Sequence, residues 1–199
     1  ETGTPFIFFR DTVNAANPNK HAGMIYASNL CHEIAQNVGF TNLAEEIINE
    51  DGTITTKTNT GDMVTCNLNS ISLGRITDEE LEENIALQIR MLDNVISINQ
   101  APVPESRMTS DKYRAIGLGT SGYHHYLVNH NIQWESDEHI EVADKLFENI
   151  AFYAIKASME LAKEKGAYPA FKGSEWETGE YFTRRGYTSD RWKQLAADV

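Results

Sequence analysis

The clearest pattern of hydrophobic and polar positions is a helical period in the first half of the chain. Thr77 followed by Glu80 has the form of a capping box, in which two residues satisfy each other's backbone N–H groups. After it, apolar residues recur at three- and four-residue spacing, which places them on one face of a helix. We predict a helix from Asp78 to near Ile98. Its buried stripe comprises Leu81, Ile85, Ile89, Leu92 and Ile96.

A longer helix is predicted in the last third of the chain. It should begin after Ser136, because Asp137 and Glu138 favour the positive end of a helix. It should end near Gly166, after two lysines that suit the negative end. The predicted buried stripe of this helix contains Ile140, Phe147, Ile150, Ala154, Ser158 and Leu161.

The remaining pattern predicts two strands, an exposed excursion and two further helices. Pro5–Phe9 is a short apolar run typical of a buried strand, and Met63–Leu68 is a second candidate strand. Asp51–Asp62 is rich in Thr, Asn and Gly, which is typical of an exposed loop or hairpin. We also predict helices at Arg114–Tyr126, despite its glycines, and at Ser189–Ala197.

Composition limits the classes of protein that fit. The chain has 199 residues, 41% of them hydrophobic, which is enough for one domain with a core. Its net charge of −12 repels a phosphate backbone and argues against nucleic acid as the main partner. No apolar run approaches the ~20 residues of a membrane span, and the first residues do not resemble a secretion signal. We expect a cytoplasmic protein with no membrane partner, and the missing initiator Met indicates an internal piece of a longer protein.

Two patterns could carry a cofactor or a metal, but each has a simpler explanation. Gly117–Gly122 satisfies G-x-G-x-x-G, yet charged residues precede it where a dinucleotide fingerprint needs a hydrophobic strand. Close packing of the glycines is the favoured interpretation. His124, His125 and His130 lack an HxxxH or ExxH partner, and a solvated polar face is favoured there. We therefore predict no metal site.

The two cysteines differ in their neighbours. Two are too few for a disulfide scaffold and lack the spacing of a zinc site. Cys66 lies in an apolar segment and is compatible with a small residue filling a core. Cys31 lies between Asn29 and Glu33, and burying these polar groups unpaired would cost about 1–3 kcal/mol each. If this segment is extended, the three side chains share one face, as in the wall of a polar pocket.

Three ordered motifs carry a family resemblance. Ser28-Asn29-Leu30-Cys31-His32-Glu33-Ile34, Cys66-Asn67-Leu68-Asn69-Ser70-Ile71 and Arg114-Ala115-Ile116-Gly117-Leu118-Gly119 resemble the large, catalytic subunit of class I ribonucleotide reductase. The similarity extends over nearly the whole chain. Asn69 stands where this family usually has Gly.

The resemblance implies a role for each site residue. Cys31 would be the transient thiyl radical that abstracts the 3′ hydrogen of the ribose, and Glu33 would take the proton of the 3′ hydroxyl. Asn29 would hydrogen-bond the substrate, and Cys66 would be one half of a redox dithiol. The substrate-binding residues would be Ser28, Asn29, Leu30, Cys31, His32 and Glu33.

The resemblance also implies a fold, partners and cofactors. The α/β fold would be part of a ten-stranded barrel, with several long helices. Residues 1–199 would form one partial domain, with a finger loop at about 11–33 and an incomplete second barrel half at about 63–199. This chain would bind no cofactor itself. A metal-containing small subunit would supply the radical, and a thioredoxin- or glutaredoxin-type reductant the electrons.

By the same resemblance, the substrate would be a ribonucleoside diphosphate, and the complete subunit would be a homodimer. The chain would need the remaining segments of the large subunit. A second redox cysteine, the nucleotide-sensing regions and the substrate-phosphate loop are among the parts that these residues lack. We therefore expect the isolated chain to be inactive.

Two other functions remain open from the sequence alone. A cysteine hydrolase could use Cys31 as nucleophile with His21 or His32 as base, although alternation along an extended segment would turn His32 away from its neighbour. A split-subunit fragment could instead serve only as a scaffold for assembly.

Overall fold

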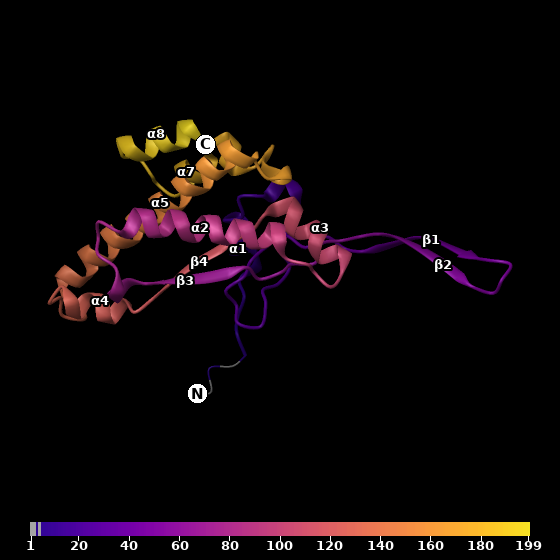
Figure 1. Cartoon of the computed structure of the whole chain (residues 1–199), viewed down its shortest axis with the longest axis horizontal. Helices are drawn as coiled ribbons and strands as arrows, with labels where there is room; N and C mark the ends of the chain where they lie inside the picture. The colour runs from indigo at the N-terminus through magenta and orange to yellow at the C-terminus, as the bar shows by residue number, and fades with distance from the viewer. Residues whose placement is uncertain (1–2, 4) are drawn as a thin grey trace. The chain divides into compact units, whose positions relative to one another are not determined.

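The computed structural model (Figure 1) describes residue 3 and residues 5–199. The chain divides into two compact units. The first unit comprises Glu1–Thr65, Gln100–Tyr113 and Pro169–Tyr181. The second comprises the three segments Cys66–Asn99, Arg114–Tyr168 and Phe182–Val199. The finger loop and barrel half expected from the resemblance stay predictions.

Two parallel strands and two helices frame the second unit. Strand β3 (Leu68–Ser72) pairs with β4 (Gly117–Ser121) in parallel, with Leu68 opposite Gly117. Helix α2 (Leu81–Ile98) packs against β3, β4 and α5 (Asp137–Lys165). A parallel pair needs a long crossover connection, and α2 lies within it. The shorter elements of this unit are η2 (Leu73–Arg75), α4 (Tyr123–Asn129) and α8 (Asp190–Asp198).

The core of the second unit is built on the stripe predicted for α2. All five predicted positions, Leu81, Ile85, Ile89, Leu92 and Ile96, are buried. Leu81, Ile85 and Ile89 belong to one buried cluster with residues of η2 and α4, including Leu73 at 1% exposure and Leu127 at 0%. Half of the predicted capping box is present, because the Thr77 N–H donates to a carboxylate oxygen of Glu80 over 2.9 Å.

The bounds predicted for the longest helix are confirmed, but its buried stripe is only partly right. The Ser136 hydroxyl accepts from the His139 N–H over 3.1 Å, and Gly166 follows the last helical residue. Ile140 is 67% exposed, Phe147 is 42% exposed and Ser158 is exposed as well, so these three expectations were wrong. The predicted stripe mixed two adjacent rows of the helix, of which one faces the core. The buried row is Leu146, Ile150, Ala157 and Leu161.

The helix predicted at Arg114–Tyr126 was wrong. Gly117–Ser121 is strand β4, and α4 begins only at Tyr123, after Gly122 in the left-handed conformation. The close fit to β3 explains the glycines, because a Cβ at Gly119 would lie 2.9 Å from the Ser70 hydroxyl oxygen. The need for glycine here comes from the neighbouring strand β3, and helical periodicity in the sequence does not reveal it. The short C-terminal helix predicted at Ser189–Ala197 is confirmed as α8.

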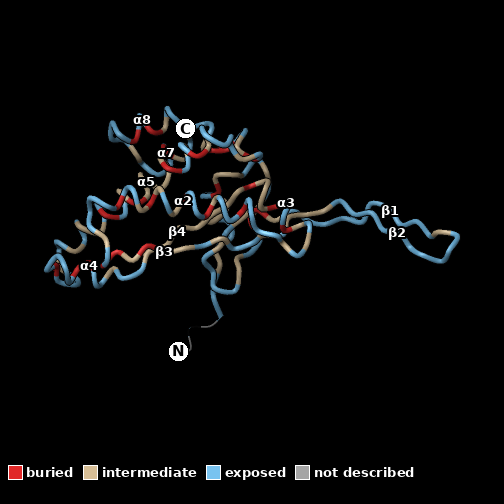
Figure 2. Tube along the Cα trace, in the orientation of Figure 1, coloured by how far each residue is buried: buried red, intermediate tan, exposed pale blue. Residues whose placement is uncertain are grey.

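The first unit contains an exposed hairpin and short helices. Strands β1 (Asn42–Ile48) and β2 (Ile54–Asn59) pair antiparallel and are exposed at every position (Figure 2). The turn and β2 confirm the excursion predicted at Asp51–Asp62, but β1 lies before the predicted range. Lys57 pairs with Glu45 across the hairpin over 2.7 Å. The short elements are α1 (Arg10–Ala15), η1 (Lys20–Ala22), α3 (Pro104–Tyr113), η3 (Pro169–Phe171) and α6 (Glu175–Thr178). Helix α7 (Glu180–Arg184) contains the boundary between the units.

Two strand predictions failed. Pro5–Phe9 is not a strand, and Phe6, Ile7 and Phe9 are 56%, 78% and 70% exposed. An apolar run becomes a strand only where a neighbouring strand can accept its hydrogen bonds, and the described residues offer it none. Met63–Leu68 was placed too early, because β3 begins at Leu68. Of the helices that the structure describes, none has the length and apolar character needed to cross a membrane.

We expect Gly74→Ala to lower the free energy of unfolding by about 1–3 kcal/mol. Gly74 is buried in η2, and an added Cβ would overlap the imidazole of His125 and lie 2.7 Å from the His125 Cβ. Urea unfolding followed by circular dichroism measures the loss. The matched control repeats the substitution in a His125→Ala background, where the cost should shrink because the ring is gone. An equal cost in both backgrounds would show that the ring is not the obstacle.

Candidate functional site

The Cys31 motif forms a tight turn. The His32 N–H donates to the Asn29 carbonyl over 3.2 Å, and His32 has a φ of 65°, in the left-handed region. This geometry contradicts the extended segment in which Asn29, Cys31 and Glu33 share one face. Local side-chain hydrogen bonds can close a turn in place of an extended strand, and the alternation of side chains along the sequence does not reveal them.

The Asn29 amide braces this turn from within. Its Oδ1 accepts from the Ile34 N–H over 3.0 Å, so the side chain spans the turn. The Ser28 hydroxyl donates to the Ile34 carbonyl over 2.5 Å and ties the same two ends together. Asn29 and Ser28 therefore hold the shape of the segment that carries Cys31.

The reactive groups of the motif point to solvent or to neighbouring aromatic rings. Cys31 is a free thiol and is exposed, as is Glu33. Leu30, between the amide and the thiol, is 88% exposed. The His32 ring packs against Phe6 with 4.7 Å between ring centroids. Both the thiol and the carboxylate are thus accessible to a ligand.

An open hollow of about 770 Å³ lies beside the turn. Ser28 and His32 line it together with Arg10 and the aromatic residues Phe8 and Phe9. This volume is in the range of small-molecule sites. Aromatic rings can stack on a planar base, and a guanidinium can bind a phosphate through two parallel hydrogen bonds.

The sequence interpretation did not single out Arg10. It lies directly after the aromatic run, and the only sequence signal was that one cation follows four apolar residues. Pro5–Phe9 was predicted as a buried strand, and a buried strand would not place its rings and Arg10 around a surface hollow, as the structure does.

Cys66 lies in the second unit, just before β3, and is exposed. Its interpretation as a buried core thiol is therefore wrong. The next residue is held firmly, because the Asn67 Nδ2 donates to the Leu92 carbonyl over 2.7 Å and the Gly117 N–H donates to the Asn67 carbonyl over 2.9 Å. Cys66 thus sits at the fixed start of the parallel pair.

The glycine pattern at Gly117–Gly122 and the three histidines near it have structural explanations. The G-x-G-x-x-G pattern begins within β4 itself, and residues 114–116 directly before it are not a strand, whereas a dinucleotide fingerprint follows one. His124, His125 and His130 are exposed, as expected for a polar face. Within residue 3 and residues 5–199, no three His, Cys, Asp or Glu side chains form a group that could hold a metal ion.

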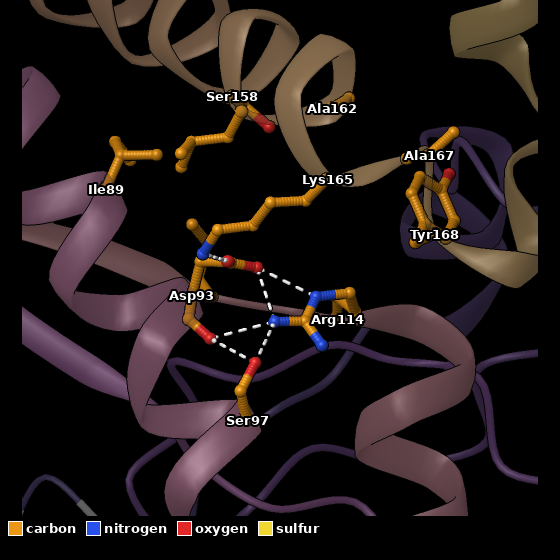
Figure 3. A pocket seen from close by; sticks show the side chains of 12 residues that line it. Ile89, Asp93, Ser97, Arg114, Ser158, Ala162, Lys165, Ala167 and Tyr168 are labelled. Carbon is orange, nitrogen blue, oxygen red and sulfur yellow. Dashed lines mark hydrogen bonds and ion pairs between the residues drawn. The ribbon is translucent and has the colours of Figure 1, made fainter.

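A second pocket, of about 290 Å³, surrounds an ion cluster in the second unit (Figure 3). The Arg114 Nε donates to Asp93 Oδ1 over 2.8 Å, and the Lys165 Nζ donates to Asp93 Oδ2 over 2.6 Å. A further Arg114 nitrogen donates to the Ser97 hydroxyl over 2.9 Å. The cluster joins α2 and α5 to Arg114, which lies in the segment just before β4.

The pKa of Asp93 reflects this pairing. Burial by itself would raise the pKa of the carboxyl. Hydrogen bonds and positive charge from Lys165 and Arg114 act in the opposite direction, and the pKa lies below its ordinary value of 3.8. The Asp93 carboxylate therefore stays ionised and links Arg114 to Lys165.

Comparison with known proteins defines the class to which this fold and site correspond. The family model for the ribonucleotide reductase barrel domain matches residues 1–199. The chain belongs to this family. Its helices and open sheets are those of an α/β fold, as predicted.

The relatives include several named subunits. The chain is 53% identical over 205 residues to the ribonucleoside-diphosphate reductase subunit alpha of Treponema pallidum, covering 100% of this chain and 24% of the relative. It is 38% identical over 216 residues to the subunit of the same name from Helicobacter pylori strain J99, covering 90% and 27%. The Synechocystis subunit alpha is 35% identical over 209 residues, covering 100% and 24%. The chain thus spans about a quarter of the length of these relatives.

We expect Asp93→Asn to lower the free energy of unfolding at pH 7 by about 2 kcal/mol, because Arg114 and Lys165 lose their shared anion. In the unsubstituted protein this contribution is complete above pH 3.8 and disappears as the pH falls through the lowered pKa of folded Asp93. Urea unfolding at a series of pH values should show a flatter acid limb in the variant.

The matched control for this prediction is Asp111→Asn. Asp111 pairs with Arg107 on an exposed helix surface, where the substitution should change stability by less than about 0.5 kcal/mol. An unchanged acid limb in Asp93→Asn would contradict the role assigned to the cluster.

Proposed function

We propose that this chain supplies the reacting thiol of a ribonucleoside-diphosphate reductase alpha subunit. One observation carries the proposal: within a family match over residues 1–199, Cys31 is an exposed free thiol on a turn between Asn29 and Glu33. The hollow beside the turn supports the same conclusion, because its size suits a small-molecule ligand.

The first step of the proposed reaction takes place at the ribose. Cys31, as a thiyl radical, removes the hydrogen atom from C3′, so an S–H bond forms and the C3′–H bond breaks. The unpaired electron is then on C3′. Glu33 accepts the proton of the 3′ hydroxyl, which is the role of a general base. Asn29 orients the substrate by a hydrogen bond and does not titrate.

The second step reduces C2′. The 2′ hydroxyl leaves as water, and Cys66 together with a second thiol supplies two electrons and two protons as the pair becomes a disulfide. Because Cys31 is the other cysteine of these 199 residues, the second thiol must come from outside them. The hydrogen atom then returns from Cys31 to C3′ and regenerates the thiyl radical, and Glu33 returns its proton to the 3′ oxygen.

The proposed substrate is a ribonucleoside diphosphate bound in the hollow. The rings of Phe8 and Phe9 would contact the base, and Arg10 would contact the diphosphate. The proposed partners are the remaining segments of the large subunit, a second copy of that subunit and a metal-containing small subunit that supplies the radical. A thioredoxin- or glutaredoxin-type protein would reduce the disulfide.

We expect Cys31→Ser to abolish deoxynucleotide formation in the full-length subunit assembled with its radical-generating partner. Serine preserves the size of the side chain, but its O–H bond is a poor hydrogen-atom donor. Product formation and release of tritium from a 3′-tritiated substrate are both measured, and both should fall to background. Product formation at the unsubstituted rate would overturn the radical assignment.

Cys66→Ser should separate the two steps. Sustained product formation should stop, because the dithiol cannot form its disulfide, while tritium release from C3′ continues since Cys31 is intact. The measurement is the ratio of tritium released to product formed, with excess reductant present. Sustained reduction at the normal rate would rule out the dithiol role of Cys66.

A further inference from the structure

We propose that Asn17 and Asn37 are positioning residues for Cys31. Their side-chain amides close the base of the loop that carries the reactive turn, and we call this arrangement the amide clasp. The proposal rests on the function proposed above, because it assigns the clasp a role in hydrogen-atom transfer by Cys31.

The amide clasp is a closed ring of hydrogen bonds. The Asn17 Nδ2 donates to the Asn37 Oδ1 over 2.7 Å, and the Asn37 Nδ2 donates to the Asn19 carbonyl over 2.9 Å. The Asn19 N–H completes the ring by donating to the Asn17 Oδ1 over 2.9 Å. Each amide therefore uses both its oxygen and its nitrogen.

Both asparagines of the clasp are buried, with 4% exposure for Asn17 and 3% for Asn37. Asparagine is uncommon at such positions, because a buried amide is costly unless it is hydrogen-bonded. Two apolar side chains could fill this space without fixing a direction. Two paired amides allow only the register in which donors meet acceptors, so the clasp specifies how the two ends of the loop align.

Two further contacts tie the first half of the loop to residues just outside it. The Val38 N–H, directly after the clasp residue Asn37, donates to the Met24 carbonyl over 3.0 Å. The Asn14 amide from α1 grips the backbone of buried Ile25, accepting from its N–H over 2.9 Å and donating to its carbonyl over 2.7 Å.

The loop is therefore fixed at its base and braced at its tip. The clasp aligns residues 17 and 37, whereas Asn29 and Ser28 hold the turn around Cys31. A shift at the base moves the braced turn as a body and displaces the thiol. Hydrogen transfer requires the reacting atoms in near-attack geometry, where a displacement of about 1 Å can lower the rate about 100-fold.

The test uses Asn37→Ala and Asn17→Ser in the full-length subunit with its radical-generating partner. Asn37→Ala removes both hydrogen bonds that the Asn37 side chain makes. Asn17→Ser is the milder change, because its hydroxyl can still accept from the Asn19 N–H while the donor to Asn37 is lost. Asn49→Ala is the matched control, since the Asn49 amide binds threonine hydroxyls at the hairpin turn instead.

We expect kcat to fall about 10- to 100-fold in both clasp variants, with less than a twofold change in the dissociation constant for substrate. The kinetic isotope effect on kcat with 3′-deuterated substrate should rise, because hydrogen abstraction becomes slower relative to the other steps. Asn49→Ala should change neither quantity.

Two outcomes would overturn the proposal. An unchanged kcat in both variants would do so, as would a fall in kcat that matches the folded fraction and leaves the isotope effect unaltered. If Asn37→Ala does not fold, Asn17→Ser alone decides between these results. Cys31→Ser is assayed in parallel. If the Cys31→Ser subunit retains activity, the proposed function itself fails. If it is inactive while the clasp variants are unaltered, only the role proposed for the clasp is rejected.

Discussion

Backbone hydrogen bonding is the constraint on which both units depend, and they satisfy it in different ways. In the second unit, β3 pairs with β4 and the long helices α2 and α5 bond internally. The loop around Cys31 has little regular structure, so asparagine side chains take over this task. Asn14 and Asn29 bond backbone groups as a neighbouring strand would. The turn that carries Cys31 can therefore be ordered and still be exposed.

The elements that could be predicted from the sequence are those whose stabilising contacts follow one periodic face. Every residue predicted for the α2 stripe is buried, and the bounds of α5 were correct because Ser136 caps its start and Gly166 follows its end. Such signals are local, since each residue needs only its helical neighbours. The exposed excursion at Asp51–Asp62 was predicted from its turn-rich composition, but the first strand of the hairpin, β1, was not.

The elements that could not be predicted depend on contacts between distant segments or on single side-chain bonds. The glycines of β4 allow it to lie close against β3. Helical periodicity in the sequence does not show that such a neighbouring strand is present. The turn at Asn29 depends on one amide that reaches Ile34. The motif at Asn29–Glu33 could be recognised in the sequence, but its backbone conformation could not be predicted from it. Family resemblance located the candidate residues, and the structure revised the backbone geometry around them.

The parallel pairing of β3 and β4 has a consequence for the order of folding. Its partners, such as Leu68 and Gly117, lie about fifty residues apart, so closing this loop costs roughly 3 kcal/mol of chain entropy. Helix α2 lies inside the loop and needs only local contacts. Forming α2 first shortens the flexible chain that must be closed. We infer that this unit acquires its helix before its sheet, so the segment beside Cys66 is ordered late.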